Sequence, residues 1–417
     1  SSDRIHSVAL ITWLILLILS ICLTQPMKYS TNLIAILIVL LALIGCSAAA
    51  QPPLPPTPPA ATVSVALLAP TTGELAPIGR AVQNGVTLAF DQWNEPGGLL
   101  NRPITWQIYP TACTFDSGQE AARQAIEDGR RFIIGPVCSE AALGAAPVAQ
   151  AAEALLISPT AIHPLVTVDP QQQVRPTVFT VAYGEALQGQ AAAQLAYDHL
   201  AKRRAALLYS PQDMAAVRLV EAFAGQFQAD GGEIVNRSPY PGGTTDFGEW
   251  LWAIGESGAD LLYLPADAAT ANQVAAQLRE LAVDSSDGGE LTLLGSDAWE
   301  SDQLDRTLVD GSYFPVHYTP LDPNPKIKTW ADTYKSVYAV APNTLAALAY
   351  DTANILAEAI HQANALDPLV VAEMIEPSRF EGVTGPITFE GDHRALKPVP
   401  FIQIREQTGQ YVTSVQP

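Results

Sequence analysis

The sequence predicts an α/β protein with two doubly wound parallel-sheet lobes, joined by a hinge of several chain crossovers. From residue 62 onward, short apolar runs rich in β-branched residues alternate with longer segments of helical periodicity. This alternation is typical of a parallel sheet covered by helices on both faces. It occurs in two successive rounds, and a long helical segment and further strands follow both. Each lobe therefore takes segments from both ends of the chain.

The first round of elements ends near residue 158. Its predicted strands and helices alternate in the order 63–68 (strand), 79–94 (helix), 104–109 (strand), 117–128 (helix), 132–135 (strand), 143–154 (helix) and 155–158 (strand). The second round, built in the same way, runs 186–200 (helix), 205–209 (strand), 215–230 (helix), 233–237 (strand), 246–255 (helix), 260–264 (strand), 271–281 (helix) and 291–295 (strand).

The end of the chain adds a helix at 345–364, a strand at 383–389 and a hairpin of 401–405 with 411–415. We expect lobe I to comprise 62–182 and 316–390, and lobe II to comprise 183–315 and 391–417.

Two apolar stretches precede the folded part, at 8–23 and 33–44. Each is shorter than the roughly 20 residues that a membrane-spanning helix prefers. Met27 supplies a start, a positive charge follows it, and the second stretch then reads as the apolar region of a signal peptide over 27–45. Residues 1–26 are either sequence upstream of the true start or an additional apolar membrane segment. We favour the former because Met27 provides a complete start of its own.

Cys46 follows Leu43, Ile44 and Gly45, an arrangement that resembles the bacterial lipobox. In that motif the cysteine receives diacylglycerol and becomes the mature N-terminus. The linker at 46–61 then contains six prolines within 52–59. Such a run adopts extended polyproline II structure and acts as a semi-rigid spacer.

The acidity of the chain excludes some partners. The formal net charge is −20, whereas nucleic-acid phosphates require a basic face. The same acidity argues against docking on an anionic lipid surface and favours a soluble body that repels its neighbours.

The four cysteines are Cys22, Cys46, Cys113 and Cys138. Their spacing fits no CxxC metal pattern. The pair in the globular part suggests one disulfide and an oxidising compartment, and two unrelated buried thiols are the alternative.

The sequence gives little support for an enzymatic activity, because no GxSxG, HExxH, P-loop or GxGxxG motif stands in a suitable context. His163 and His317 have no obvious nucleophile as a partner. We therefore expect a binding protein that needs no cofactor and no metal.

Several segments of the folded part resemble, in collinear order, the type I periplasmic binding proteins, specifically the leucine/isoleucine/valine-binding branch of ABC importers. They are VALLAPTTG at 65–73, FDQWNEPGGLLNR at 90–102, IIGPVCS at 133–139, ISP at 157–159, AYD at 349–351 and VTGPITF at 383–389. The resemblance implies the type I two-lobed fold and a disulfide between Cys113 and Cys138. It extends from residue 62 to the C-terminus.

The resemblance also implies a ligand site in the cleft, where the carboxyl ends of the strands meet. Ser139 opens a helix, so its hydroxyl and the free N–H groups there can hold a carboxylate, although a plain helix N-cap is the alternative. Thr160 stands at a backbone-contact position, and Ile162 replaces a family threonine. Asp297 occupies the place of the carboxylate that faces the ligand's ammonium, with an N-cap as its alternative.

Other positions depart from the family pattern. Ile78 stands where relatives often carry an aromatic residue, and Met214 and Asp267 replace two aromatic or polar contacts. Trp299 supplies either a substitute wall of the site or a core side chain. These departures leave an amino acid, an amide or another small metabolite open as the ligand.

The resemblance implies an extracytoplasmic solute-binding protein that closes its two lobes around a small polar, amino-acid-like ligand. Its partner would be an ABC permease, and Cys46 would anchor it to the outer face of the cell membrane. We expect a monomer. The alternative function is a stand-alone ligand sensor acting through a signalling partner. Such receptors usually carry a transmembrane segment and an output domain after this fold.

Overall fold

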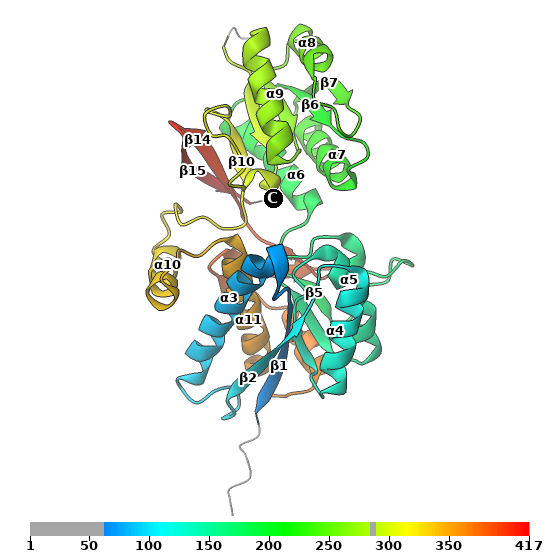
Figure 1. Cartoon of the computed structure of the whole chain (residues 1–417), viewed down its shortest axis with the longest axis vertical. Coiled ribbons are helices and arrows are strands. Elements are labelled where there is room, and N and C mark those ends of the chain that lie inside the picture. Colours follow the sequence, from blue (N-terminus) through cyan, green and yellow to red (C-terminus); the bar gives the residue numbers. More distant parts are fainter. Residues whose placement is uncertain (1–61, 284–288, 417) are drawn as a thin grey trace, which may run out of the picture. The chain divides into compact units, whose positions relative to one another are not determined.

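The structure is a computed structural model that describes residues 62–283 and 289–416. The expected signal peptide, Cys46 and the proline-rich linker lie outside the described residues. The described part contains two sheets, each flanked by helices (Figure 1). This arrangement confirms the predicted α/β class with two lobes.

The first lobe is built on an eight-stranded sheet in the order β11-β12-β13-β5-β4-β3-β1-β2, in which β1 to β5 run parallel. Its strands are β1 (Val63–Ala69), β2 (Ile104–Pro110), β3 (Phe132–Ile134), β4 (Leu155–Ser158), β5 (Val178–Thr180), β11 (Phe380–Gly382), β12 (Gly385–Glu390) and β13 (Arg394–Leu396). Its helices are η1 (Gly73–Leu75), α3 (Ala76–Asn94), α4 (Phe115–Glu127), α5 (Ser139–Ala151), η2 (Pro164–Val166), α10 (Pro325–Tyr338), α11 (Thr344–Ala363) and α12 (Pro368–Ile375).

The second lobe is built on a seven-stranded sheet in the order β15-β14-β10-β9-β8-β6-β7. Its strands are β6 (Arg204–Tyr209), β7 (Glu233–Pro239), β8 (Leu261–Leu264), β9 (Thr292–Gly295), β10 (Tyr313–Pro315), β14 (Val399–Arg405) and β15 (Thr408–Val415). Its helices are α6 (Glu185–Gln194), η3 (Leu195–His199), α7 (Met214–Ala229), α8 (Gly248–Glu256), α9 (Ala268–Leu281) and η4 (Asp297–Trp299).

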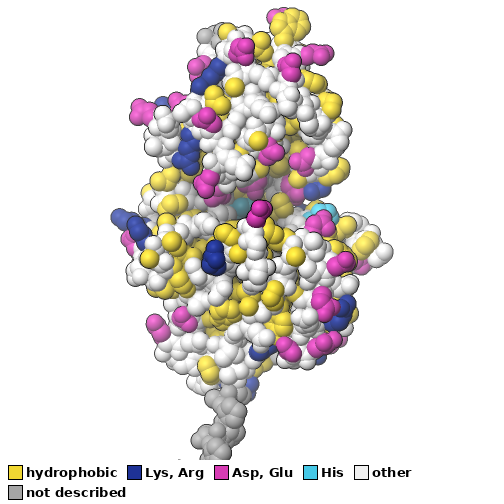
Figure 2. All heavy atoms as spheres, viewed as in Figure 1, with side chains coloured by type: hydrophobic (Ala, Val, Ile, Leu, Met, Phe, Trp, Pro, Cys, Tyr) yellow, Lys and Arg dark blue, Asp and Glu magenta, His cyan; other side chains and the backbone are white. Residues whose placement is uncertain are grey.

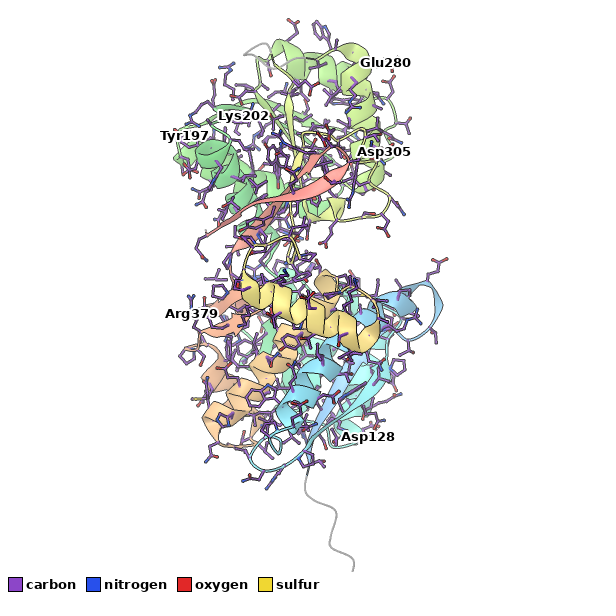
Figure 3. The ribbon with its side chains drawn as sticks, turned by 90° about the vertical axis from the view of Figure 1, so that its left-hand side faces the viewer. Asp128, Tyr197, Lys202, Glu280, Asp305 and Arg379 are labelled. Atoms are coloured by element: carbon purple, nitrogen blue, oxygen red, sulfur yellow. A yellow bond between two sulfur atoms is a disulfide. The ribbon has the colours of Figure 1, made fainter. Side chains whose placement is uncertain are left out.

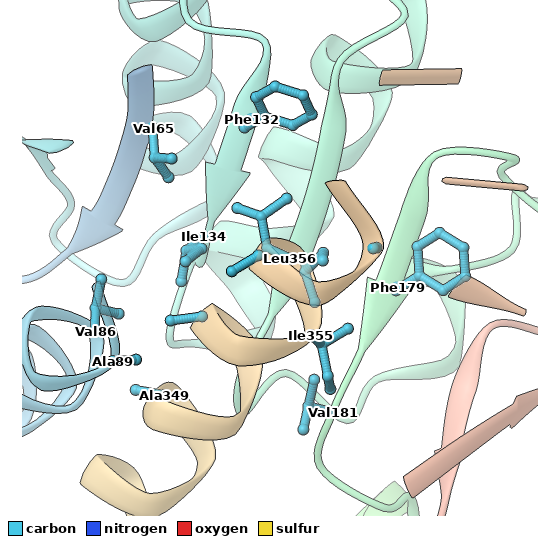
Figure 4. Close-up of a cluster of buried hydrophobic side chains, with 14 of the residues drawn as sticks. Val65, Val86, Ala89, Phe132, Ile134, Phe179, Val181, Ala349, Ile355 and Leu356 are labelled. Atoms are coloured by element: carbon cyan, nitrogen blue, oxygen red, sulfur yellow. The ribbon is translucent and has the colours of Figure 1, made fainter. Parts of the chain in front are cut away.

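Side chains on the two faces of each sheet form separate cores. Along β1, Val65 and Leu67 pack toward the side of α3 and α11, whereas Ala66 and Leu68 pack toward α4 and α5. This period of two follows from the pleat of a strand, and burial on both faces explains the continuous apolar run. Figure 4 shows the first of these cores, with side chains of the sheet meeting those of α3 and α11.

The surface of both lobes carries scattered charges. Figure 3 labels a set of polar side chains on the two lobes, namely Asp128, Tyr197, Lys202, Glu280, Asp305 and Arg379. Within the described residues, no helix is long and apolar enough to cross a membrane.

The chain passes between the lobes three times, at residues 181–184, 316–324 and 397–398. The last passage differs from the expected boundary at 390/391. The reason is that β13 returns antiparallel to β12 and inserts beside β5, where Arg394 pairs with Thr180. The three-residue strands β5, β10, β11 and β13 and the helices α10 and α12 were not predicted from the sequence.

A disulfide joins Cys113 and Cys138, whose Cα atoms lie 5.3 Å apart. It connects the residues just before α4 and α5. These helices pack closely, because a Cβ at Gly118 would lie 1.9 Å from the carbonyl oxygen of Ala141. The disulfide therefore fixes two helix N-termini at the edge of the sheet where the ligand cleft was predicted.

The double variant Cys113→Ala/Cys138→Ala is expected to lose about 3–4 kcal/mol of unfolding free energy. The link closes a loop of 25 residues, and its removal restores conformational entropy to the unfolded chain. Urea unfolding monitored by tryptophan fluorescence measures the loss. The wild type under reducing conditions is the control and should lose the same amount. A change below about 1 kcal/mol would contradict the prediction.

Candidate ligand-binding site

A cavity of about 860 Å³ is lined by residues of both lobes. Figure 2 shows the hollow between the lobes on one face, with acidic side chains around it. The polar part of the lining includes Thr160, Asp297, Glu300, Ser301, Asp302, Arg306, His317, Thr319, Asn343 and Thr344. The apolar part includes Ile162, Ala182, Trp299, Phe314, Val316, Tyr318, Leu321, Leu345, Leu348, Ile402 and Ile404. Such a wall, apolar with a few convergent polar groups, is typical of a small-molecule site.

Asp297 stands in the loop that follows β9, at the first position of η4. Ser296 is the N-cap of that turn, so the Asp297 side chain does not serve as the cap. One Asp297 carboxylate oxygen (Oδ2) lies 3.5 Å from Nε2 of His317. The backbone N–H of Asp297 donates to the side-chain oxygen of Gln188 at 3.3 Å. The side chain retains 27% exposure, so a ligand in the cavity can reach it.

The surroundings keep Asp297 ionised. Burial raises the pKa of its carboxyl, but hydrogen bonds from His317, Gln188 and the Ala298 N–H, together with the positive charge that His317 carries in acid, outweigh that effect and lower the pKa overall. Asp297 is therefore an anion throughout the neutral range. Burial and the charge of Lys397 lower the pKa of His317, against the opposing effect of Asp297. The imidazole is accordingly neutral at pH 7, and its hydrogen bond to Asp297 leaves the carboxylate charge uncompensated.

Glu300 links the two walls of the cavity. The hydroxyl of Thr344, the first residue of α11, donates to both carboxylate oxygens of Glu300, at 2.6 and 2.8 Å. Desolvation by the surrounding protein, together with the negative charge of Asp297, raises the pKa of Glu300 to about 7. A lobe II carboxylate thus contacts the N-terminus of a lobe I helix, an end that favours negative charge.

The structure brings four of the predicted residues to the cavity wall: Thr160, Ile162, Asp297 and Trp299. Trp299 is both wall and core, because only 1% of it is exposed and its ring packs over Gly295. Ser139 lies next to this group and does not act as a plain N-cap. It follows the N-cap Cys138, and its hydroxyl accepts the N–H of Ile162 at 3.2 Å. The hydroxyl of Thr160 donates to the carbonyl of Val137.

The other three predicted residues are not part of the cavity wall. Ile78 packs against the core of the first lobe. Met214 opens α7 and is 59% exposed. The carboxylate of Asp267 caps α9 by accepting the N–H of Thr270 at 2.7 Å. These three positions lie near the switch points of the sheets, whereas the cavity lies on the side of β4, β9 and β10.

Sequence reasoning did not find several residues of the wall. Glu300, His317 and Thr344 come from separate segments, and Ile402 and Ile404 come from β14 near the end of the chain. The sequence carried one indication of these residues. Glu300 and His317 each follow the end of a strand of the second sheet within a few residues, where ligand contacts are expected.

A second polar cluster lies beside the crossovers. Asp351 of α11 is 1% exposed and accepts three hydrogen bonds, from the N–H of Val383 at 2.7 Å and from the N–H and hydroxyl of Thr384 at 2.9 and 2.6 Å. Nζ of the buried Lys397 donates to the same hydroxyl at 2.7 Å. The cluster ties the long helix of the first lobe to the third crossover. Within the part of the chain that the structure describes, no group of three or more His, Cys, Asp or Glu side chains is arranged to hold a metal ion.

Two lobes of this topology, with an ionised carboxylate in the cavity that they both line, define a ligand-capturing protein. Residues 62–410 match the periplasmic binding protein family. The chain belongs to this family, which confirms the resemblance and the expected fold.

Individual relatives agree with the family match. The chain is 23% identical over 333 residues to the leucine-, isoleucine-, valine-, threonine-, and alanine-binding protein of Pseudomonas aeruginosa, covering 79% of this chain and 86% of the relative. The crystal structure of the leucine-binding protein LivK from Thermotoga maritima superposes with a TM-score of 0.67 at 26% identity, covering 85% of this chain and 99% of the other. The branched-chain amino acid transporter substrate-binding protein LivJ of Streptococcus pneumoniae, solved with isoleucine, gives a TM-score of 0.69 at 23% identity, covering 86% and 100%.

Asp351→Ala is expected to lower the free energy of unfolding by about 3–5 kcal/mol. Three buried donors would lose their acceptor, and Lys397, whose pKa burial lowers to about 7, would lose the carboxylate that favours its charged form. Chemical denaturation measures the change. Asp351→Asn, which retains one acceptor oxygen, should lose less. Equal losses in both variants, or none, would show that the hydrogen bonds do not stabilise the crossover.

Proposed function

We propose that this protein is the extracytoplasmic solute-binding component of an ABC importer, and that it captures a zwitterionic amino acid with an apolar side chain. The observation that carries the proposal is the ionised carboxylate of Asp297 in the wall of a largely apolar cavity between the lobes. An ammonium ion is the natural partner of that carboxylate, because charge-assisted hydrogen bonds are strong where water is excluded.

Groups on the first lobe suit the other end of an amino acid. Thr160 lines the cavity, and Ser139 opens the 13-residue helix α5. The first N–H groups of a helix favour a carboxylate. The side chain of the ligand would then lie against Leu345, Leu348 and Ile402. The names of the relatives, which describe binding of leucine, isoleucine and valine, support the same ligand class.

The binding mechanism follows from the division of these groups between the lobes. The first lobe holds the carboxylate end, and closure about the three crossovers brings Asp297 to the ammonium. The closed form would then dock on a membrane permease. We propose that the soluble part acts as a monomer.

Asp297→Asn is expected to weaken the binding of L-leucine by a factor of about 100 or more, since truncating one partner of a buried charge pair costs about 2–5 kcal/mol. Isothermal titration calorimetry at pH 7.5 measures the dissociation constant. Asp302→Asn, at an exposed position of the same wall, is the matched control and should change it less than threefold. Similar losses in both variants would point to a general charge effect rather than an ammonium site.

We also propose that Cys46 carries a lipid that holds the protein at the outer face of the cell membrane. The Gly45-Cys46 pair after an apolar segment, and the proline-rich spacer that follows, support this anchor. Labelled palmitate should enter the wild type and the Cys22→Ala control in bacterial cells, and should not enter Cys46→Ala. Label in Cys46→Ala would overturn the assignment.

A further inference from the structure

The three crossovers meet through their side chains. Tyr183 comes from the first crossover, His317 from the second and Lys397 from the third. The rings of Tyr183 and His317 stack, with centroids 3.7 Å apart and planes inclined by 28°. Nζ of Lys397 lies 5.9 Å from the centroid of the Tyr183 ring. All three residues are less than 10% exposed, so the hinge itself contains a buried stack of an aromatic ring and two basic groups.

This stack connects the interior of the first lobe to the ligand cavity. At one end, Lys397 contacts Thr384, which donates to the buried Asp351. At the other end, Nε2 of His317 lies 3.5 Å from Asp297, and His317 itself lines the cavity. A change of charge on His317 therefore acts directly on the carboxylate that would receive the ligand.

The carboxylate of Asp297 carries one negative charge, so it can balance the charge of only one adjacent cation. A neutral imidazole donates a hydrogen bond and orients the carboxylate while leaving its charge available for an ammonium. An imidazolium 3.5 Å away would instead form an ion pair with Asp297 and repel a second cation at the same place.

The groups around His317 decide which form it adopts. Asp297 favours the charged form, whereas burial and the charge of Lys397 favour the neutral one, and the pKa of His317 falls below its usual range. Tyr183 covers one face of the ring. Nδ1 of His317 has no hydrogen-bond partner within the described residues. Glu300 lies next to Asp297 on the same wall and titrates near neutral pH, so it needs a separate control.

We propose that His317 is a positioning residue that couples ligand retention to protonation: neutral, it orients Asp297 toward the ammonium of the ligand, and protonated, it takes Asp297 as its own counter-ion and releases the ligand. The proposal rests on the proposed function, because it assumes that an ammonium binds Asp297. Burial and the charge of the hinge residue Lys397 then both lower the pH of release.

The direction in which the dissociation constant changes with pH follows from the coupling between proton binding at His317 and ligand binding at Asp297. Protonation of His317 disfavours binding, so the dissociation constant is lowest at pH 7–8. Below the pKa of His317 it rises with acidity, approaching about tenfold for each pH unit. Asp297 does not contribute to this rise, because its own pKa lies below its ordinary value.

The first arm of the test is calorimetric titration of the full chain with L-leucine between pH 5 and 8. The wild type should bind more weakly as the pH falls. His317→Gln, whose amide keeps a donor toward Asp297 but does not titrate, should bind nearly equally across the range. Glu300→Gln should retain the weakening at acidic pH. A flat wild-type profile, or one that only Glu300→Gln abolishes, would overturn the proposal.

The second arm needs no ligand. The imidazole carbon-bound proton of His317, assigned by its loss in His317→Gln, reports the titration of the ring by NMR. Lys397→Met removes a positive charge and should move the titration to higher pH, and Asp297→Asn should move it to lower pH. If Lys397→Met folds poorly, the charge-neutral Asp351→Asn/Lys397→Met pair replaces it and should shift the titration in the same direction.

The two arms distinguish the two proposals. Absence of leucine binding at every pH counts against the proposed function. A His317 titration that is unchanged in both Asp297→Asn and the Lys397 variant counts against the coupling, whether or not leucine binds.

Discussion

The passage of the chain between the lobes at three places is the constraint on which the remaining structure depends. Each lobe completes its sheet with segments from distant parts of the sequence. The lobes therefore share a hinge that consists of the three crossover segments. The carboxyl ends of the strands face this hinge region, and the cavity that we propose for the ligand lies where they meet. Polar groups beside the crossovers are held in place by buried contacts, as Asp351 shows with three donors on one carboxylate.

The same constraint explains how the groups of the proposed site are distributed between the lobes. The carboxylate of Asp297 belongs to the second lobe, and Thr160 and the start of α5 belong to the first. Neither lobe alone forms the cavity, so the proposed binding depends on the distance between the lobes. A hinge that contains titratable side chains can make that affinity respond to the medium, because Tyr183, His317 and Lys397 lie in the segments that must bend.

Much of the fold was predictable from the sequence because long apolar strands and amphipathic helices carry a strong periodic signal. Strands of three residues such as β5 and β10 carry almost none, and their pairing depends on neighbours far along the chain. The helix α10 had local signals, since Asn324 caps it and Pro325 opens it, but its place beside the long helix is a tertiary property. In the site, Asp297 was found through family resemblance. Glu300 and His317 were not found in this way. Their contact partners in the site, Thr344 and Tyr183, stand 44 and 134 residues away from them in the chain.

The position of the C-terminal strands has a consequence for how the chain is made. Strands β12 and β13 complete the first sheet, and β14 and β15 complete the second, so both lobes need segments that are synthesised after all their other strands. Until they emerge, β5 and β10 are open edges, and an open edge can pair with another chain. The N-terminal lobe therefore cannot fold to completion ahead of the rest, as separate domains usually do. Both lobes reach their final form only after residues 385–415 have been synthesised.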